Sequence, residues 1–273
     1  MWNAWKRHWP EYGMEAAGLG LFMLSACSFA TLLAYPGSAV HLALPDPTLR
    51  RGLMGLAMGL TAIGLIYSPW GKQSGAHFNP AVTFTFWRLG KIAGWDAGFY
   101  VLAQFIGGSL GVMLAAQLLR DPLAHPSVHY AVTAPGGFGL GWAFAGELVI
   151  SFLLMSMVLR ISNSLRLNRF TGLFAGTLVA LYILLEDPIS GMSMNPARTW
   201  SSALSARDFS AWWIYFSAPL AGMLLAAELY VHTRGRGAVR CAKLHHMNQK
   251  RCIFRCGFHA PALAGPDSGG AGS

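Results

Sequence analysis

Six apolar runs constrain the fold of this chain more than any other feature of its sequence. They cover about 13–34, 52–70, 93–119, 138–159, 170–186 and 211–231. A helix of about 20 apolar residues crosses the roughly 30 Å hydrocarbon layer of a membrane. Only 11% of the residues are charged, against about 25% in an average soluble domain. The runs therefore predict an all-α integral membrane protein with six transmembrane helices.

The positive charges lie unevenly around these runs. Of the 20 lysines and arginines, 15 fall on one side of the predicted membrane: Lys6, Arg7, Lys72, Arg88, Lys91, Arg160, Arg166, Arg169, Arg234, Arg236, Arg240, Lys243, Lys250, Arg251 and Arg255. Because lysine and arginine gather in cytoplasmic loops, we expect both termini in the cytoplasm. The net charge of +9 then indicates contact with anionic lipid, and we expect no nucleic-acid partner. The short loops and the lack of a targeting segment predict a bacterial inner (plasma) membrane.

Two short stretches repeat one pattern in opposite halves of the chain. GAHFNPAV covers 75–82 and GMSMNPAR covers 191–198, and each places Asn-Pro-Ala four residues after a glycine. The first box (Asn79, Pro80, Ala81) follows the second run, and the second box (Asn195, Pro196, Ala197) follows the fifth. An odd number of spans in each half turns the second half upside down relative to the first. We predict inverted repeats over 12–119 and 120–232, between an N-terminal segment 1–11 and a tail 233–273.

Each box predicts the start of a helix. Asparagine is a strong N-cap, and proline is favoured at the first helical position. Helices over about 79–89 and 195–206 would each be about 15 Å long, half of the hydrocarbon layer. We expect them to be re-entrant half-helices whose N-termini meet in the middle of the membrane.

The loops before the half-helices must also enter the membrane. Irregular backbone at that depth occurs only where protein buries it or where it lines a wet cavity. Glu15 and Glu147 are lone carboxylates at matching places early in the first and fourth runs. Since a paired occurrence favours a common role, we expect both to accept hydrogen bonds from N–H groups of these loops.

This arrangement suits the passage of uncharged polar molecules. The positive ends of two helix dipoles would repel cations and protons, while the Asn79 and Asn195 amides could donate to a neutral oxygen. Two other kinds of protein stay open: a secondary active transporter coupled through Glu15 or Glu147, and a non-conducting membrane scaffold. The chain shows no nucleophile–base set, phosphate loop or intramembrane metal cluster, so we expect no enzymatic activity.

These residues resemble the aquaporin family of major intrinsic proteins over about 12–232. SGAHFNPAV at 74–82, MNPAR at 194–198 and the paired glutamates carry the resemblance. It implies two inverted repeats of three spans and one half-helix, assembled as a homotetramer with a channel in each protomer. It also implies passive flux of water or small neutral solutes without a cofactor.

The resemblance further implies a four-residue selectivity filter beside the boxes. Arg198 directly follows the second box and matches the filter arginine. Counting back from the second box without gaps places Met192 and Ile183 at two more positions. The same count from the first box places Gly59 at the fourth position, whereas one extra loop residue would place Met58 there.

The expected substrate stays open between water and larger solutes. The chain lacks the histidine and the aromatic residue of a water-specific filter, which favours a glycerol- or urea-type facilitator. Thr199, Ala203 and the pair Tyr215-Phe216 instead fit the water-type pattern, although the two aromatic residues also fit plain helix packing. We therefore expect water first, with small neutral solutes as the alternative.

His77 lies two residues before Asn79. It could line the inner vestibule and hinder passage when protonated, since histidine titrates near pH 6.5. It could equally be a buried imidazole held by loop carbonyls.

The tail is rich in cysteine and histidine. Its stretch CAKLHHMNQKRCIFRCGFH (241–259) offers Cys241, His245, Cys252 and Cys256 as candidate zinc ligands. The alternative is a basic tail with reduced, palmitoylated cysteines. The composition of 262–273 predicts disorder.

Overall fold

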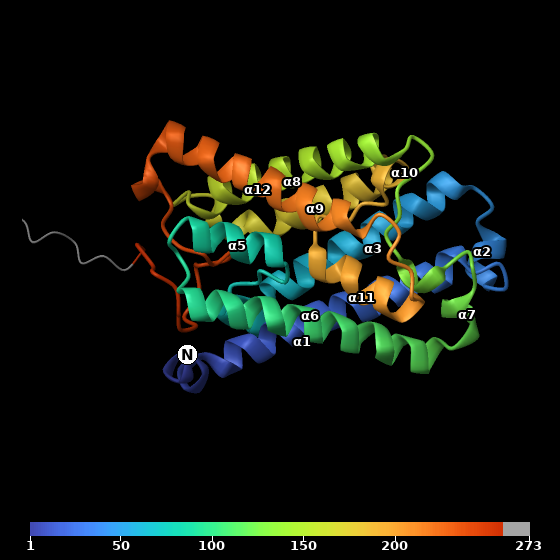
Figure 1. Cartoon of the computed structure of the whole chain (residues 1–273), viewed down its shortest axis with the longest axis horizontal. Coiled ribbons are helices and arrows are strands. Elements are labelled where there is room, and N and C mark those ends of the chain that lie inside the picture. Colours follow the sequence, from blue (N-terminus) through green and yellow to red (C-terminus); the bar gives the residue numbers. More distant parts are fainter. Residues whose placement is uncertain (259–273) are drawn as a thin grey trace, which may run out of the picture.

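Six long helices form the body of the protein in the computed structural model, which describes residues 1–258 (Figure 1). They are α1 (Trp2–Ala34), α3 (Pro47–Tyr67), α6 (Gly94–Leu119), α8 (Leu140–Ser162), α9 (Thr171–Leu185) and α12 (Trp212–Arg234). Within the described residues, six helical stretches are long and apolar enough to cross a membrane; five are these helices, and the sixth is α9 together with the short helical turn before it, Asn168–Leu185. The predicted all-α class with six spans is confirmed. His259 and the segment 262–273, for which we predicted disorder, lie outside the described residues.

Two of the spans begin earlier than their apolar runs. The helix α1 already starts at Trp2, within the predicted N-terminal segment 1–11. Its first turns pack on α6, where Asp96 accepts hydrogen bonds from Tyr12 (2.6 Å) and contacts His8 (2.9 Å). The helix α3 starts at Pro47 because Asp46 caps it. Hydropathy misses both starts, because the first turns of α1 and α3 include polar and charged residues.

Three helix pairs build the bundle: α1 with α6, α8 with α12, and α3 with α9. Glycines allow the close approach in each pair. A Cβ at Gly107 of α6 would lie 2.0 Å from the Ala16 carbonyl of α1, and one at Gly222 of α12 would lie 2.3 Å from the Leu148 carbonyl of α8. The first two pairs occupy matching places in the two halves, and the third joins the halves.

Two shorter helices lie among the spans (Figure 1). They are α5 (Pro80–Arg88), which follows α4 (Pro69–Ser74), and α11 (Pro196–Ala206), which follows α10 (Asp187–Ser190). Their bounds lie within one residue of the predicted half-helices. The connections hold α2 (Ala39–Ala43), α7 (Asp121–Ala124) and the 3-10 helices η1 (His129–Ala131), η2 (Asn168–Phe170) and η3 (Arg236–Ala238).

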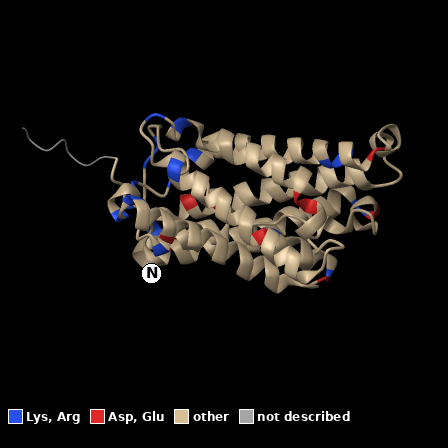
Figure 2. Ribbon diagram, turned by 90° about the horizontal axis from the view of Figure 1, so that it is seen from above, with Lys and Arg blue, Asp and Glu red and all other residues tan. Residues whose placement is uncertain are grey.

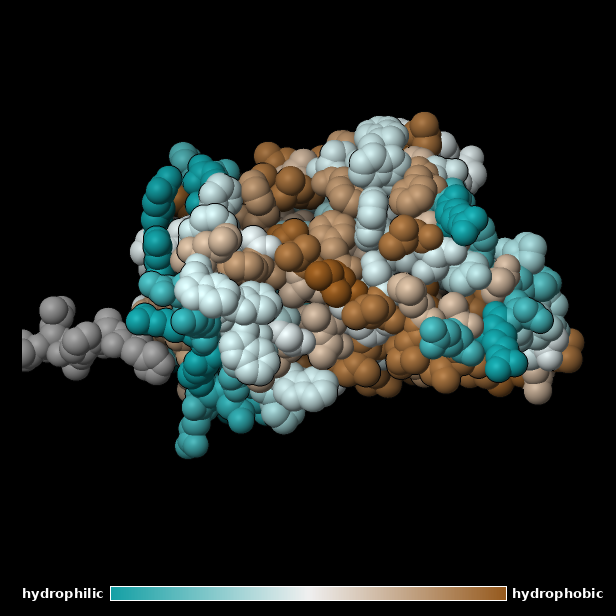
Figure 3. Space-filling model, turned by 60° about the horizontal axis from the view of Figure 1, so that its bottom comes forward, coloured by the Kyte–Doolittle hydropathy of each residue, from teal (hydrophilic) through white to brown (hydrophobic). Residues whose placement is uncertain are grey.

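The surface divides into a hydrophobic belt and two hydrophilic ends (Figure 3). Large apolar side chains of the spans, such as Leu60 of α3 and Leu118 of α6, are more than half exposed, as expected of helices that face lipid. The N-terminus and the chain after α12 lie at the same end of the bundle (Figure 1). Most lysines and arginines gather at that end (Figure 2), which we call the basic end.

Residues 239–258 fold back onto the basic end without forming a regular helix or strand. The Leu244 N–H donates to the Gly75 carbonyl (3.1 Å), and the Arg255 N–H donates to the Lys91 carbonyl (2.9 Å). The segment is therefore attached to the loops on both sides of α5.

Candidate functional site

Asn79 and Asn195 join the two half-helices end to end. The Asn79 Oδ1 caps α5 by accepting from the Ala81 N–H (2.8 Å), while its Nδ2 donates to the Met194 carbonyl (2.7 Å). The Asn195 Oδ1 caps α11, and its Nδ2 donates to the Phe78 carbonyl (2.8 Å). Each asparagine thus caps its own helix and holds the loop of the opposite half.

The buried carboxylate of Glu15, a residue of α1, is surrounded by the loop before α5. Its Oε1 accepts from the Ser74 hydroxyl (2.7 Å) and the His77 N–H (3.1 Å). Its Oε2 accepts from the Phe78 N–H (2.6 Å) and the Gln104 amide (2.8 Å). The carboxylate thereby supplies acceptors to the backbone and side-chain donors of this loop and to Gln104.

Glu147 has the corresponding place before α11. Its Oε1 accepts from the Ser190 hydroxyl (3.0 Å) and the Ser193 N–H (2.5 Å), and its Oε2 accepts from the Met194 N–H (2.7 Å). Both glutamates therefore make the contacts that we expected from their paired positions.

A pair of tyrosines completes the support of these loops. The Tyr100 hydroxyl donates to the Ser74 carbonyl (2.6 Å), and the Tyr215 hydroxyl donates to the Ser190 carbonyl (2.5 Å). Sequence reasoning missed Tyr100 and treated Tyr215 as a substrate-type marker or a packing residue. Both are fully buried, and their matching positions in the two halves were a signal that could have identified the pair.

His77 is a buried imidazole with both ring nitrogens in contact with protein atoms. Its Nδ1 lies 3.0 Å from the Thr83 hydroxyl, and its Nε2 lies 2.9 Å from the Ala242 carbonyl. Its ring is stacked between Phe86 and Phe254. The geometry favours the fixed imidazole over a freely titrating vestibule group, and the carbonyl that holds it belongs to the tail segment.

A cavity of about 160 Å³ lies between the two loops. Both box asparagines and residues from both halves line it, among them Met58, His77, Ile183, Met192, Arg198 and Leu244. A wider cavity of about 630 Å³ opens next to it and shares with it the lining residues Met54, Ile183, Asp187, Gly191 and Arg198. The two cavities therefore meet beside Arg198.

Three of the residues predicted for the filter line the smaller cavity. Arg198 and Ile183 line both cavities, and Met192 lines the narrower one. The Arg198 guanidinium donates to the hydroxyl of Thr133, a buried residue in the connection before α8. Asp187 also lines both cavities, and Thr133 holds the Arg198 side chain from outside them. Nothing in the local sequence distinguishes either residue.

Gly59, which the ungapped count places at the fourth filter position, does not line the cavity. A Cβ at Gly59 would lie 2.6 Å from the Gly176 carbonyl, so this residue faces α9. Met58 instead lines the cavity. Of the two candidates for the fourth position, the cavity therefore favours Met58, because the packing of α3 on α9 turns Gly59 away from it.

The tail places a different histidine with its cysteines than we predicted. The ligand atoms of Cys241, His246, Cys252 and Cys256 all lie within 4.8 Å of one another. The His245 ring packs against Tyr67. Two adjacent histidines in an irregular segment point to different sides, and no sequence pattern distinguishes them.

The six spans and the two joined half-helices define an integral membrane protein built from two inverted repeats around a central cavity. The chain belongs to the major intrinsic protein family, whose model matches residues 8–230. The resemblance inferred from the boxes is thereby confirmed.

Known proteins agree with this assignment. Aquaporin NIP2-3 from Zea mays is 36% identical over 190 residues, which cover 69% of this chain and 60% of the maize protein. The probable aquaporin AqpM from Archaeoglobus fulgidus is 37% identical over 184 residues, which cover 65% of this chain and 74% of the archaeal protein. The chain thus spans about three fifths of the length of the maize relative.

A solved structure shows the same fold. The aquaglyceroporin from Plasmodium falciparum superimposes with a TM-score of 0.67 at 21% sequence identity. The superposition covers 82% of this chain and 95% of that chain.

Proposed function

We propose that this protein is a passive channel for water that excludes ions and protons. The observation that carries the proposal is the convergence of Asn79 and Asn195 in one cavity, each at the N-terminus of its half-helix. A side-chain amide nitrogen has two N–H groups, and each Nδ2 donates one of them to a carbonyl of the opposite loop. The other is available to an oxygen in the cavity.

The same geometry explains the exclusion of cations. Each half-helix carries about half a positive charge at its N-terminus, and both N-termini meet at the cavity. The guanidinium of Arg198 adds a full positive charge where the two cavities meet. A cation or hydronium would lose its hydration shell in a field of its own sign, whereas water exchanges hydrogen bonds at little cost.

Small neutral solutes such as glycerol and urea are the second candidate substrates. Met58, Ile183 and Met192 give the cavity an apolar lining beside Arg198. Flexible methionine side chains adapt to the alkyl part of a solute, while Arg198 offers hydrogen-bond donors to its oxygen atoms. The names of the sequence relatives are those of aquaporins.

We further propose that the basic end faces the cytoplasm and that four copies assemble in the membrane, as is typical of the family. The proposed orientation is supported by the lysines and arginines gathered at that end (Figure 2). Channels of this kind work without a catalytic step or cofactor, so we still expect this protein to have no enzymatic activity and no cofactor.

Stopped-flow light scattering on proteoliposomes tests the function. We expect water permeability well above that of empty liposomes, with glycerol and urea compared in the same vesicles. A secondary active transporter would instead show solute uptake that follows an imposed proton gradient. A non-conducting scaffold would show no gain over empty liposomes, and either result contradicts the channel.

A further inference from the structure

The tail brings three thiols and one imidazole to a single point. Cys241, His246, Cys252 and Cys256 place one ligand atom each within 4.8 Å of all the others. These residues follow the part of the chain that matches the family model, which ends at residue 230. The membership of the family therefore does not account for them.

The distances between the ligand atoms suit the tetrahedral coordination of one metal ion. The sulfur atoms of Cys241 and Cys252 are 3.5 Å apart, and the Cys256 sulfur is 3.6 Å from the His246 Nε2. Ligands about 2.3 Å from a central zinc ion are separated by about 3.8 Å in a tetrahedron. Soft thiolates with one imidazole select zinc over calcium or magnesium.

The surrounding charge fits a metal site of this kind. Three thiolates on Zn²⁺ leave a net charge of about −1. Lys243 is only 1% exposed, and its Nζ donates to the carbonyls of Lys250 (3.1 Å) and Arg251 (2.7 Å). Lys243 is two residues from Cys241, and the thiolates of the site would supply negative charge that stabilises this buried ammonium.

A cross-link would stabilise the segment. Residues 239–258 form no regular helix or strand, yet Cys241, Leu244 and Phe254 are buried. A piece of chain this short has too small an apolar core to order itself, and structural metals commonly replace the missing core.

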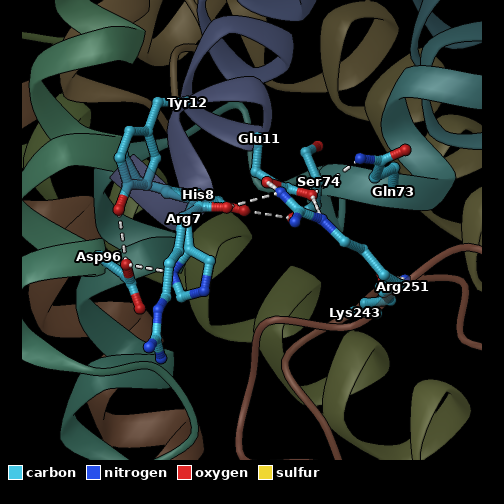
Figure 4. A network of polar contacts seen from close by, with 10 residues as sticks. Arg7, His8, Glu11, Tyr12, Gln73, Ser74, Asp96, Lys243 and Arg251 are labelled. Atoms are coloured by element: carbon cyan, nitrogen blue, oxygen red, sulfur yellow. Dashed lines mark hydrogen bonds and ion pairs between the residues drawn. The ribbon is translucent and has the colours of Figure 1, made fainter. Parts of the chain in front are cut away.

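This segment lies across the basic end of the cavity. The Ala242 carbonyl contacts the His77 Nε2 (2.9 Å), the Phe254 ring stacks on the His77 ring, and Leu244 lines the cavity itself. A contact with α1 also holds the segment. The Arg251 Nε donates to the Glu11 Oε1 (2.6 Å), which also accepts from Gln73 (Figure 4).

We propose that Cys241, His246, Cys252 and Cys256 bind one zinc ion, which holds residues 239–258 as a cap over the basic end of the cavity. The metal site stands on its own geometry. The effect of the cap on permeability rests on the proposed channel function.

Metal analysis of the full-length protein tests the site. The protein is purified under reducing conditions with its affinity tag removed, and zinc is measured by mass spectrometry. We expect about one zinc ion per chain in the wild type, as in structural zinc sites. We expect its loss in His246→Asn and Cys252→Ser and its retention in the controls His245→Asn and Cys27→Ala. The site is overturned if the wild type contains no zinc, or if Cys241 and Cys252 form a disulfide instead. Equal zinc content in all variants also overturns it.

Water permeability tests the cap. A strong zinc chelator is added to wild-type proteoliposomes and to proteoliposomes of His246→Asn. We expect a severalfold rise in the wild type and no response in the variant, which is already open. If zinc-loaded protein is permeable to water and its permeability does not change when the chelator is added, the cap is overturned. Zinc-loaded protein with no permeability before or after chelation overturns the channel function and leaves the zinc site standing.

Discussion

At the scale of the residue, Arg198 differs most from its counterpart in the other half. Val82 follows the first box and Arg198 follows the second. The arginine lines both cavities and is bound to Thr133. A cation near a helix N-terminus is electrostatically unfavourable, so its presence there requires a functional reason.

We predict that Arg198→Ala relaxes the exclusion of solutes. The truncation widens the junction of the cavities and removes a positive charge, so glycerol and urea should pass faster relative to water. The measurement is solute and water permeability in the same proteoliposomes. Arg207→Ala, at the exposed end of the same half-helix, is the control. Unchanged selectivity in Arg198→Ala would show that this residue is not part of the filter.

The Glu147 carboxylate accepts hydrogen bonds from two backbone N–H groups of the loop before α11. We predict that Glu147→Gln lowers the thermal unfolding midpoint in detergent, because an amide NH₂ would face the N–H of Ser193 or Met194. Each buried donor left without an acceptor costs about 1–3 kcal/mol. Glu228→Gln is the matched control, since its ion pair with Arg88 is half exposed and should contribute about 0–1 kcal/mol. Equal midpoints for the two variants would refute the support role.

At the scale of the element, the two halves repeat the same local construction. Gly75 and Gly191 end α4 and α10 with positive φ angles of 98° and 81°. The residues that follow repeat the pattern, with positive φ at Ala76 and Phe78 in one loop and at Met192 and Met194 in the other. Left-handed backbone at non-glycine residues is costly, and the buried glutamate in each half offsets this cost.

Helix pairing depends on glycine at the points of closest approach. We predict that Gly107→Ala reduces the stability and the yield of folded protein, because its Cβ would lie 2.0 Å from the Ala16 carbonyl of α1. Overpacking of this kind costs about 1–3 kcal/mol. Gly98→Ala in the same helix meets nothing within 4 Å and should be neutral or stabilising. Size-exclusion profiles and unfolding midpoints compare the two, and a Gly107→Ala protein as stable as Gly98→Ala would contradict the packing.

At the scale of the whole molecule, charge and chain ends coincide. The N-terminus, the tail segment and most lysines and arginines lie at the basic end (Figures 1 and 2). The hydrophobic belt separates this end from the other (Figure 3). The fold alone would fit a membrane in either direction, so the charges decide the orientation.

We predict that the basic end faces the cytoplasm. Green fluorescent protein fused to the C-terminus should fluoresce, because it folds in the cytoplasm, and alkaline phosphatase fused there should be inactive. Phosphatase inserted at Gly137, in the connection between α6 and α8 at the opposite end, should be active. The reverse pattern would overturn the orientation.

Local patterns in the sequence were enough to predict the spans, the half-helices and the two glutamates. Span length depends on the thickness of the membrane, and Asn-Pro starts a helix through contacts within a few residues. Glu15 and Glu147 could be found because a carboxylate inside an apolar run needs donors, and each half supplies a loop that has them.

Only the tertiary structure decided what depends on packing between distant segments. The contact of α3 with α9 turns Gly59 away from the cavity and Met58 into it. Thr133 reaches Arg198, Tyr215 reaches the loop before α11, and His246 rather than His245 joins the cysteines. The sequence by itself determined which segments cross the membrane and where the half-helices begin, because hydropathy and capping act locally. The lining of the cavity and the tail that covers it depend on side-chain directions, which are set when residues far apart in the chain pack together.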